Sequence, residues 1–174
     1  MSILQPIKPQ YCELIASGKK TIEVRKTRPK CELPVKVYIY ETKDKKYMNM
    51  AIYEPKNNIK FEHTPGKVIA EYICDEIIEW TEDMKPPVPL DKIQLSYSKI
   101  RQYGGDKTLY LWHISDLKIY DKPKELSEFY KSCGTQNCCD CQFWFNNGEY
   151  AACEIRPMRQ LKRPPQSWCY VEEV

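Results

Sequence analysis

Residues 18–26 read GKKTIEVRK and carry the most informative pattern in this chain. Pro9 suits a first helical turn, apolar residues follow it at helical spacing, and Gly18 is a natural helix stop. After the glycine, Ile22 and Val24 alternate with polar residues, which is the period of a strand. The sequence therefore predicts a short helix, a turn and a strand.

The polar face of this strand would carry Thr21, Glu23 and Arg25, with Lys19 and Lys20 at its start. Charged side chains gathered on one strand face can contact a phosphate or the polar edge of a base. The same pattern also fits a solvated strand face. For Arg25, an ion pair with Glu23 along the strand competes with a bidentate contact to phosphate or to a guanine edge.

The opening of the chain resembles that of the ASCH domain, a PUA-like family. The resemblance begins at Ile7-Lys8-Pro9 and continues from Glu13 to Arg25. Three later segments agree in the order that the family uses: GKVIAEY at 66–72, WHISDL at 112–117 and RPPQSWCYV at 163–171. The resemblance implies an α+β fold, a small mixed PUA-like β-barrel flanked by short helices, with a cleft beside the first helix. It also implies RNA or nucleotide binding, although a few members are enzymes.

Length and composition fit one globular domain over residues 1–174. The hydrophobic share is 42% and the charged share 29%, and a chain of this length buries about two-thirds of its unfolded surface. No apolar run approaches the roughly 20 residues of a membrane helix. The first residues lack the basic and apolar regions of a signal peptide. We therefore expect a cytoplasmic protein with no membrane partner.

Positive charge is concentrated in the first third of the chain. Residues 1–60 hold 13 Lys or Arg against 6 Asp or Glu, whereas residues 61–100 hold 4 against 8 and residues 101–174 hold 10 against 10. A local basic surface attracts polyanions and speeds their encounter. The charge distribution therefore favours a nucleic-acid partner for the part that carries the ASCH-like motif.

Strands outnumber helices in the rest of the chain. Alternating or continuous apolar patterns predict strands at 35–40 with one apolar face, at 67–75 covered on both faces, at 109–114 and at 167–171. Helical spacing predicts a helix from Leu90 to Gly104-Gly105 and another from Pro123, and a short hairpin is expected around Met48 to Tyr53. Short, irregularly spaced strands favour a closed or partly closed barrel over a doubly wound sheet. The chain has neither GxGxxG nor a P-loop motif, which argues against a dinucleotide or P-loop NTPase site.

Five of the nine cysteines cluster in a Cys-rich insertion at 132–155, before the last strand. Cys138 and Cys141 have the spacing of a zinc knuckle, and Cys133 and Cys153 can complete a four-thiolate structural zinc site. Free or redox-active thiols and disulfides are the alternatives. The insertion is also a candidate docking surface for a protein partner. Outside it, Cys12, Cys74 and Cys169 are expected to be small apolar packing residues.

Resemblance to the ASCH-like amidohydrolases that deacetylate N4-acetylcytidine implies a catalytic role for Lys20, which matches the lysine of their Gly-x-Lys-Thr motif. Their set continues with a threonine three positions on, where this chain has Glu23, and a distant glutamate, for which Glu71 and Glu76 are candidates only by location. A catalytic lysine must lose its proton near neutrality. Because Glu23 would keep Lys20 charged, the sequence favours binding over catalysis.

The expected function is a module that binds RNA or a modified nucleotide in a basic cleft and requires no cofactor. The alternative is a small hydrolase, N4-acetylcytidine amidohydrolase-like or a ribonuclease, with Lys20 and Glu23 as its catalytic residues. Trp168 offers a face for base stacking and Ser115 a hydroxyl for a ligand, while His113 is expected to be a hydrogen-bonded core residue. The candidate binding residues are Lys8, Lys19, Lys20, Thr21, Glu23, Arg25, Lys26, Arg28, Ser115 and Trp168.

Overall fold

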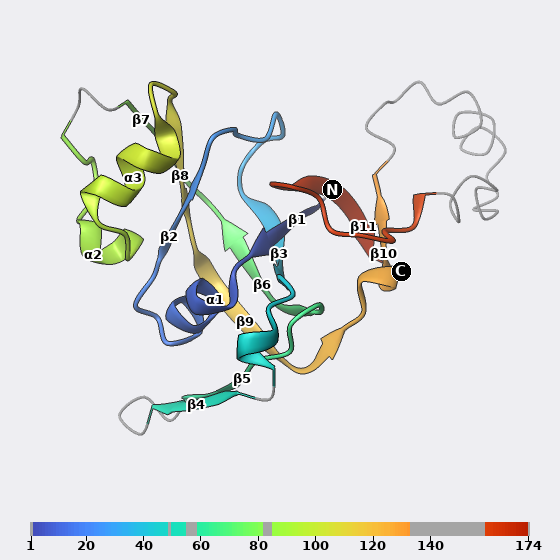
Figure 1. Cartoon of the computed structure of the whole chain (residues 1–174). Coiled ribbons are helices and arrows are strands. Elements are labelled where there is room, and N and C mark those ends of the chain that lie inside the picture. The colour runs from blue at the N-terminus through green and yellow to red at the C-terminus, as the bar shows by residue number, and fades with distance from the viewer. Residues whose placement is uncertain (1, 49, 55–58, 82–84, 133–158, 174) are drawn as a thin grey trace, which may run out of the picture.

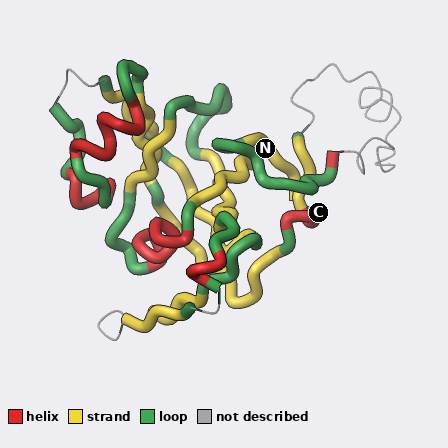
Figure 2. Tube along the Cα trace, in the orientation of Figure 1, coloured by secondary structure: helices red, strands yellow, loops and turns green. Residues whose placement is uncertain are grey.

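The computed structural model describes residues 2–48, 50–54, 59–81, 85–132 and 159–173 (Figure 1). This part of the chain is a mixed α+β structure in which strands predominate (Figure 2). The strands are β1 (Ser2–Ile7), β2 (Ile22–Arg25), β3 (Val35–Glu41), β4 (Ala51–Glu54), β5 (Ile59–Glu62), β6 (Val68–Cys74), β7 (Ile77–Trp80), β8 (Leu109–His113), β9 (Ser115–Lys124), β10 (Phe129–Lys131) and β11 (Cys169–Glu173). The helices are α1 (Pro9–Ala16), α2 (Leu90–Ile93) and α3 (Tyr97–Gly104), with short 3₁₀ turns η1 (Lys45–Tyr47) and η3 (Leu126–Glu128).

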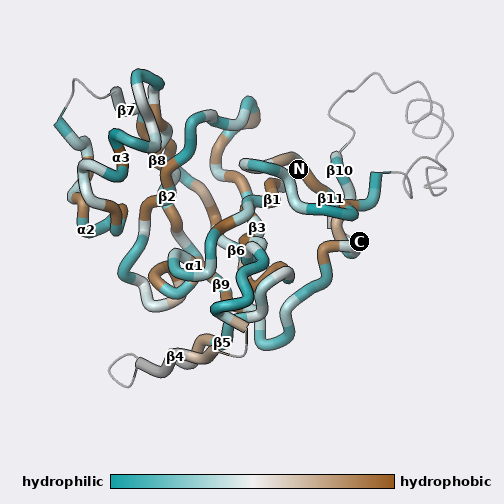
Figure 3. The backbone as a smooth tube through the Cα atoms, viewed as in Figure 1, coloured by the Kyte–Doolittle hydropathy of each residue, from teal (hydrophilic) through white to brown (hydrophobic). Residues whose placement is uncertain are grey.

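The largest sheet has the strand order β10-β11-β1-β3-β6-β9. Its centre is β1, which pairs parallel with β3 and antiparallel with β11. Ile3 and Leu4 of β1 are fully buried because both faces of the strand are covered. The sequence pattern did not reveal this strand, since a strand buried on both sides lacks the polar alternation that marks a half-exposed one. Hydrophobic residues recur along the central strands, and the connecting loops are mostly hydrophilic (Figure 3).

The second sheet has the order β2-β8-β7 and packs against α2 and α3. Ile22 and Val24 of β2 are buried in this contact, together with Ile93 of α2 and Ile100 of α3. The predicted alternation of β2 is therefore confirmed. The α2–α3 pair and the β10–β11 pair lie on opposite sides of the molecule (Figure 1).

The chain passes from the second sheet to the largest one directly after β8. It passes Ile114 and enters β9, where Ser115 already pairs with Ile73 of β6, and Asp116 at φ 46° lies at the irregularity in this pairing. The β4–β5 hairpin forms a separate two-stranded sheet, close to the position predicted for it. Within the described residues the strands form three sheets whose ladders do not close into one barrel. The α+β class is confirmed. The expected β-barrel, closed or partly closed, is not confirmed, because β2 and β7 hydrogen-bond only to β8 among the described strands.

Several local predictions were wrong for identifiable reasons. The helix expected from Leu90 to Gly104 is broken in two, because Gln94 adopts a left-handed conformation and Ser96 caps a new helix by accepting from the Lys99 amide. The segment after Pro123 forms no α-helix: β9 runs to Lys124, only the 3₁₀ turn η3 follows, and Phe129 begins β10 with its ring buried against Tyr38. Strand β7 was also missed.

Strand β3 was expected to have one apolar face and has two. Val37 and Ile39 join the core beneath α1, while Tyr38 and Tyr40 pack in a second cluster with Phe129. The predicted cover on both faces of β6 is confirmed by the burial of Val68, Ile69 and Ala70, among others. Tyr38 and Tyr40 are therefore core residues, although the sequence pattern assigned them to the face of the strand without apolar residues.

The Cys-rich insertion at 132–155 lies outside the described residues, apart from Ser132, so its zinc, thiol and disulfide interpretations stay predictions. Cys12 and Cys74 are buried, as expected of packing residues, and Cys169 packs half-buried against the cluster around Phe129. In the part of the chain that the structure covers, no helix combines the length and the apolar character needed to span a membrane.

Candidate functional site

A cavity of about 740 Å³ opens between α1, the polar face of β2 and α3. Its volume falls in the range of sites for small molecules and cofactors, about 300–1,000 Å³. The residues that line it include five of the predicted ones, from the N-cap of α1 and from β2 and its flanks, together with residues from α3 and from the segment that precedes β11. The described residues lining it are Pro6, Ile7, Lys8, Tyr11, Lys20, Glu23, Val24, Arg25, Lys26, Thr27, Thr42, Leu95, Lys99, Gln102, Tyr103, Gln166 and Ser167.

Local sequence explains how α1 and β2 come to face one another. The helix ends at Ala16, and Gly18 at φ +71° reverses the chain in a conformation that favours glycine. The amide of Lys20 then donates to the carbonyl of Leu14 at 2.9 Å, which fixes the start of β2 against the helix. The polar face of β2 is thereby held beneath the open side of α1.

Lys20 lies at the bottom of the cavity and is 2% exposed. Its Nζ donates to the carbonyl oxygens of Ile22 at 2.6 Å and Ile93 at 2.7 Å, and it lies 3.3 Å from Oε2 of Glu23. Each of the three ammonium hydrogens therefore has an oxygen acceptor. Burial lowers the pKa of Lys20, and the neighbouring Glu23 carboxylate opposes that shift. The effect of Glu23 on Lys20 has the expected direction, but burial outweighs it.

Arg25 is also buried at the bottom of the cavity. Its Nη2 donates to the carbonyl of Pro6 at 2.8 Å and lies 3.1 Å from Oε1 of Glu23, while Nη1 donates to the carbonyl of Ser167 at 3.1 Å. The ion pair along the strand is thus the interpretation that the structure favours. Glu23 holds one cation on each carboxylate oxygen, and we call Lys20, Glu23 and Arg25 the floor triad.

The mouth of the cavity carries exposed cations and two aromatic rings. We call Lys8, Lys26 and Lys99 the rim lysines; all three are exposed to solvent. Tyr11 comes from α1 and Tyr103 from α3. The Nζ of Lys26 lies 4.8 Å from the centre of the Tyr103 ring, a cation–π distance. Lys99 and both tyrosines were not among the predicted site residues.

Five predicted residues do not line the cavity: Lys19, Thr21, Arg28, Ser115 and Trp168. Arg28 forms an exposed ion pair with Glu79 at 3.1 Å, and Ser115 donates to the carbonyl of Ile73 at 2.8 Å. Both side chains are thus engaged by the protein itself.

The indole of Trp168 contacts a residue of the cavity wall. Its ring packs against Trp112 and Tyr170, with ring centres 5.8 and 5.4 Å away, and its Nε1 donates to the hydroxyl of Thr27 at 2.9 Å. Thr27 itself lines the cavity. Trp168 therefore packs within the protein, and its role in base stacking stays a prediction.

Neither histidine lines the cavity, and their environments differ from expectation. His113 is not a core residue: its side chain is 39% exposed, and its Nδ1 lies 2.7 Å from Oδ1 of Asp75. The buried imidazole is that of His63, 2.5 Å from the carboxylate of Glu41, whose pKa is raised by burial. Among the described residues, no three His, Cys, Asp or Glu side chains converge in a way that could hold a metal ion.

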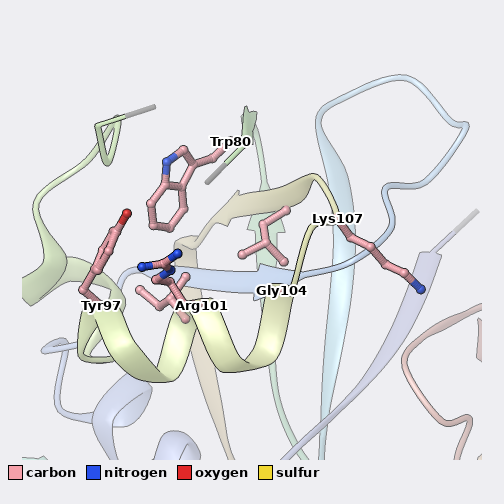
Figure 4. A pocket seen from close by; sticks show the side chains of 8 residues that line it. Trp80, Tyr97, Arg101, Gly104 and Lys107 are labelled. Atoms are coloured by element: carbon pink, nitrogen blue, oxygen red, sulfur yellow. The ribbon is translucent and has the colours of Figure 1, made fainter. Parts of the chain in front are cut away.

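A second cavity on the outer side of α3 measures only about 10 Å³. Trp80, Tyr97 and Arg101 surround it, and Lys107 points away from it (Figure 4). Its volume is at the limit for one water molecule, about 10–15 Å³. It is a packing crevice and no ligand site.

The fold has relatives among solved structures. The ASCH protein of Zymomonas mobilis is 18% identical, with a TM-score of 0.58 over 98% of this chain and 87% of that chain. Two single-residue variants of that protein are each 17% identical at the same TM-score of 0.58, covering 98% of this chain and 90% or 88% of theirs. No protein-family model and no curated protein matches the chain. The chain therefore has an ASCH-type fold.

Proposed function

Starting from this fold, we propose that the protein binds RNA, or a modified nucleotide, in the cavity beside α1. The observation that carries the proposal is the composition of the cavity wall. Among the described residues that line it are five cationic side chains, one carboxylate and two tyrosines. A concave, cationic wall with aromatic rings matches the two chemical features of a nucleotide, an anionic phosphate and a flat base.

The rim lysines are the phosphate-binding residues in this proposal. Lys8, Lys26 and Lys99 are exposed and can move to meet an incoming anion. Contacts with phosphates release counterions, so their contribution to the affinity falls as salt rises. Tyr11 and Tyr103 supply rings on which bases stack, with each stacked base worth about 1–3 kcal/mol.

Fluorescence anisotropy with a short labelled RNA tests this proposal. If each rim lysine contacts one phosphate, the logarithm of the affinity should fall with the logarithm of the salt concentration with a slope of about −2, since each contact on a single strand contributes about 0.7. Lys26→Gln should reduce that slope by about 0.7. Lys122→Gln on β9, an exposed lysine that does not line the cavity, is the matched control and should leave the slope unchanged. Undetectable binding, or binding that salt does not affect, would refute the proposal.

A hydrolase that uses Lys20 is the second candidate, and one observation favours it. Lys20 is buried at the bottom of a ligand-sized cavity, and burial lowers its pKa, as a catalytic lysine requires. Against it stands the hydrogen bonding of Lys20, because the ammonium would have to give up one of its acceptors before its nitrogen could attack a carbonyl. Neither Glu71 nor Glu76 lines the cavity; Glu71 instead accepts from Tyr120 at 2.6 Å.

Turnover assays separate the two candidates. The wild-type protein and Lys20→Ala are incubated with N4-acetylcytidine and, separately, with labelled RNA. Hydrolysis by the wild type that the variant lacks would establish the enzyme. Absence of turnover on both substrates, together with salt-dependent RNA binding, would leave the binding module.

A further inference from the structure

The bottom of the cavity offers a ligand an acceptor and few donors. The three ammonium hydrogens of Lys20 face the carbonyl oxygens of Ile22 and Ile93 and the carboxylate of Glu23. The two Nη groups of Arg25 contact backbone carbonyls of two other segments and Glu23, while its buried Nε has no hydrogen-bond partner among the described residues. The two cations that the sequence marks as ligand contacts are therefore held by the protein.

Glu23 differs from both cations because its unused bonding capacity is that of an acceptor. A carboxylate has about four lone-pair positions, and the floor triad occupies one on each oxygen. The Glu23 side chain is 11% exposed and lines the cavity. Two adjacent cations already offset its charge, so a neutral N–H group suits it better than a third cation.

Two tyrosine rings line the same cavity as this carboxylate. Tyr11 and Tyr103 reach the cavity from different helices, α1 and α3. The Nζ of Lys20 lies 5.7 Å from the centre of the Tyr11 ring and 3.3 Å from Oε2 of Glu23, so this ring and the carboxylate flank the same ammonium group. A base that packs on a tyrosine ring here enters the cavity that Glu23 lines.

We propose that the cavity takes a nucleotide unit base first, and that Glu23 selects bases with an exocyclic amino group by accepting its N–H. The phosphate then remains at the mouth with the rim lysines. This inference rests on the proposed nucleotide-binding function. It separates cytosine from uracil, because uracil presents a carbonyl oxygen where cytosine has the amino group, and that oxygen faces the carboxylate unfavourably.

Calorimetric titration of the wild-type protein with CMP and UMP tests the inference. The two nucleotides are nearly isosteric, so they differ at the position that Glu23 is proposed to read. We expect CMP to bind about tenfold or more tightly than UMP, the size of a hydrogen bond to a charged group. The same comparison with short oligocytidine and oligouridine shows whether the ligand is a free nucleotide or part of an RNA strand; discrimination in either form supports the inference.

Two variants distinguish recognition by Glu23 from a structural role. Glu23→Gln is close in shape and should bring the CMP and UMP affinities within about threefold of each other, because the amide can donate to the uracil carbonyl. Lys26→Gln, at the rim, should weaken both nucleotides equally and keep their ratio. The wild-type comparison needs no mutation, so it stands even if Glu23→Gln does not fold.

The outcomes separate this inference from the function on which it rests. Equal affinity of wild type for CMP and UMP, or tighter UMP, in both nucleotide and oligonucleotide form, overturns selection by Glu23 and leaves nucleotide binding in place. An unchanged preference for CMP in Glu23→Gln overturns it as well. If the wild type binds no nucleotide and no RNA, the proposed function fails, and this inference fails with it.

Discussion

Replacing Lys20 by methionine tests the buried bonding of the floor triad. Methionine keeps the length of the side chain and removes the charge and its donors. The substitution leaves the carbonyls of Ile22 and Ile93 without this donor and leaves Glu23 with Arg25 as its remaining cation. Breaking a buried pair by removing one partner costs about 3–5 kcal/mol, and we expect a loss of unfolding free energy of this size.

Urea denaturation followed by tryptophan fluorescence measures that loss. Lys19→Met is the matched control, since Lys19 is the exposed neighbour on the turn and exposed substitutions usually change stability by no more than about 0.5 kcal/mol. A loss of under about 1 kcal/mol for Lys20→Met would refute the bonding described for Lys20, because a buried ammonium with three acceptors cannot be removed so cheaply.

The pH dependence of unfolding stability, compared between the wild type and Lys20→Met, gives an independent check. Burial places the folded-state pKa of Lys20 below its unfolded value of 10.5, so between the two values the unfolded chain binds more protons than the folded protein. Stability contributed by this group therefore rises with pH across that interval. The wild type should gain stability relative to Lys20→Met as pH rises towards 10.5. A difference that shrinks over this interval would mean that the ammonium is not buried as described.

Three further predictions concern the turn, the core thiols and the Cys-rich insertion. Gly18→Ala should cost about 1 kcal/mol in thermal or urea denaturation, because φ is +71° there and no atom crowds an added Cβ; no loss would contradict that backbone conformation. Burial raises the pKa of Cys74 to about 12, so at pH 8 about one thiol in ten thousand is ionised. Peptide mapping after iodoacetamide should find Cys74 unmodified when the half-exposed Cys31 has already reacted, and equal rates would show that Cys74 is accessible. Metal analysis of freshly purified protein should find about one zinc per chain, removed by Cys138→Ser, if the insertion holds a four-thiolate site; zinc-free protein would leave the thiol and disulfide interpretations.

Local sequence was sufficient for the part of the fold nearest the cavity. The turn at Gly18 and the alternation of Ile22 and Val24 depend on neighbours within a few residues, and both are confirmed. Longer-range features were not accessible in this way. Strand β1 has no polar alternation because both of its faces are covered. Phe129 begins a strand despite helical spacing in the sequence, because β10 pairs with β11 and the Phe129 ring packs against Tyr38.

The same limit applies to the site. Lys20, Glu23 and Arg25 were found because one short motif contains them, and they do meet in one cavity. Their roles depend on acceptors elsewhere: one of the two carbonyls bound by Lys20 is 73 residues away in the chain, and one bound by Arg25 is 142 residues away. Tyr103 and Lys99 belong to α3, whose position beside β2 is a tertiary contact that no local pattern encodes. Sequence could therefore identify the floor of the cavity but not its opposite wall.

In the proposed function, the residue at position 23 favours binding over catalysis. In the amidohydrolase pattern that the sequence resembles, this position is a threonine, which would leave the lysine without an ionic partner on the strand. Here Glu23 takes the third hydrogen of Lys20 and also an Arg25 contact, so both cations are fixed in place. The carboxylate keeps acceptor positions that the two cations do not occupy. In the proposed function, this change of residue type adds an acceptor to the bottom of the cavity, and a base amino group is the part of a nucleotide that it would recognise.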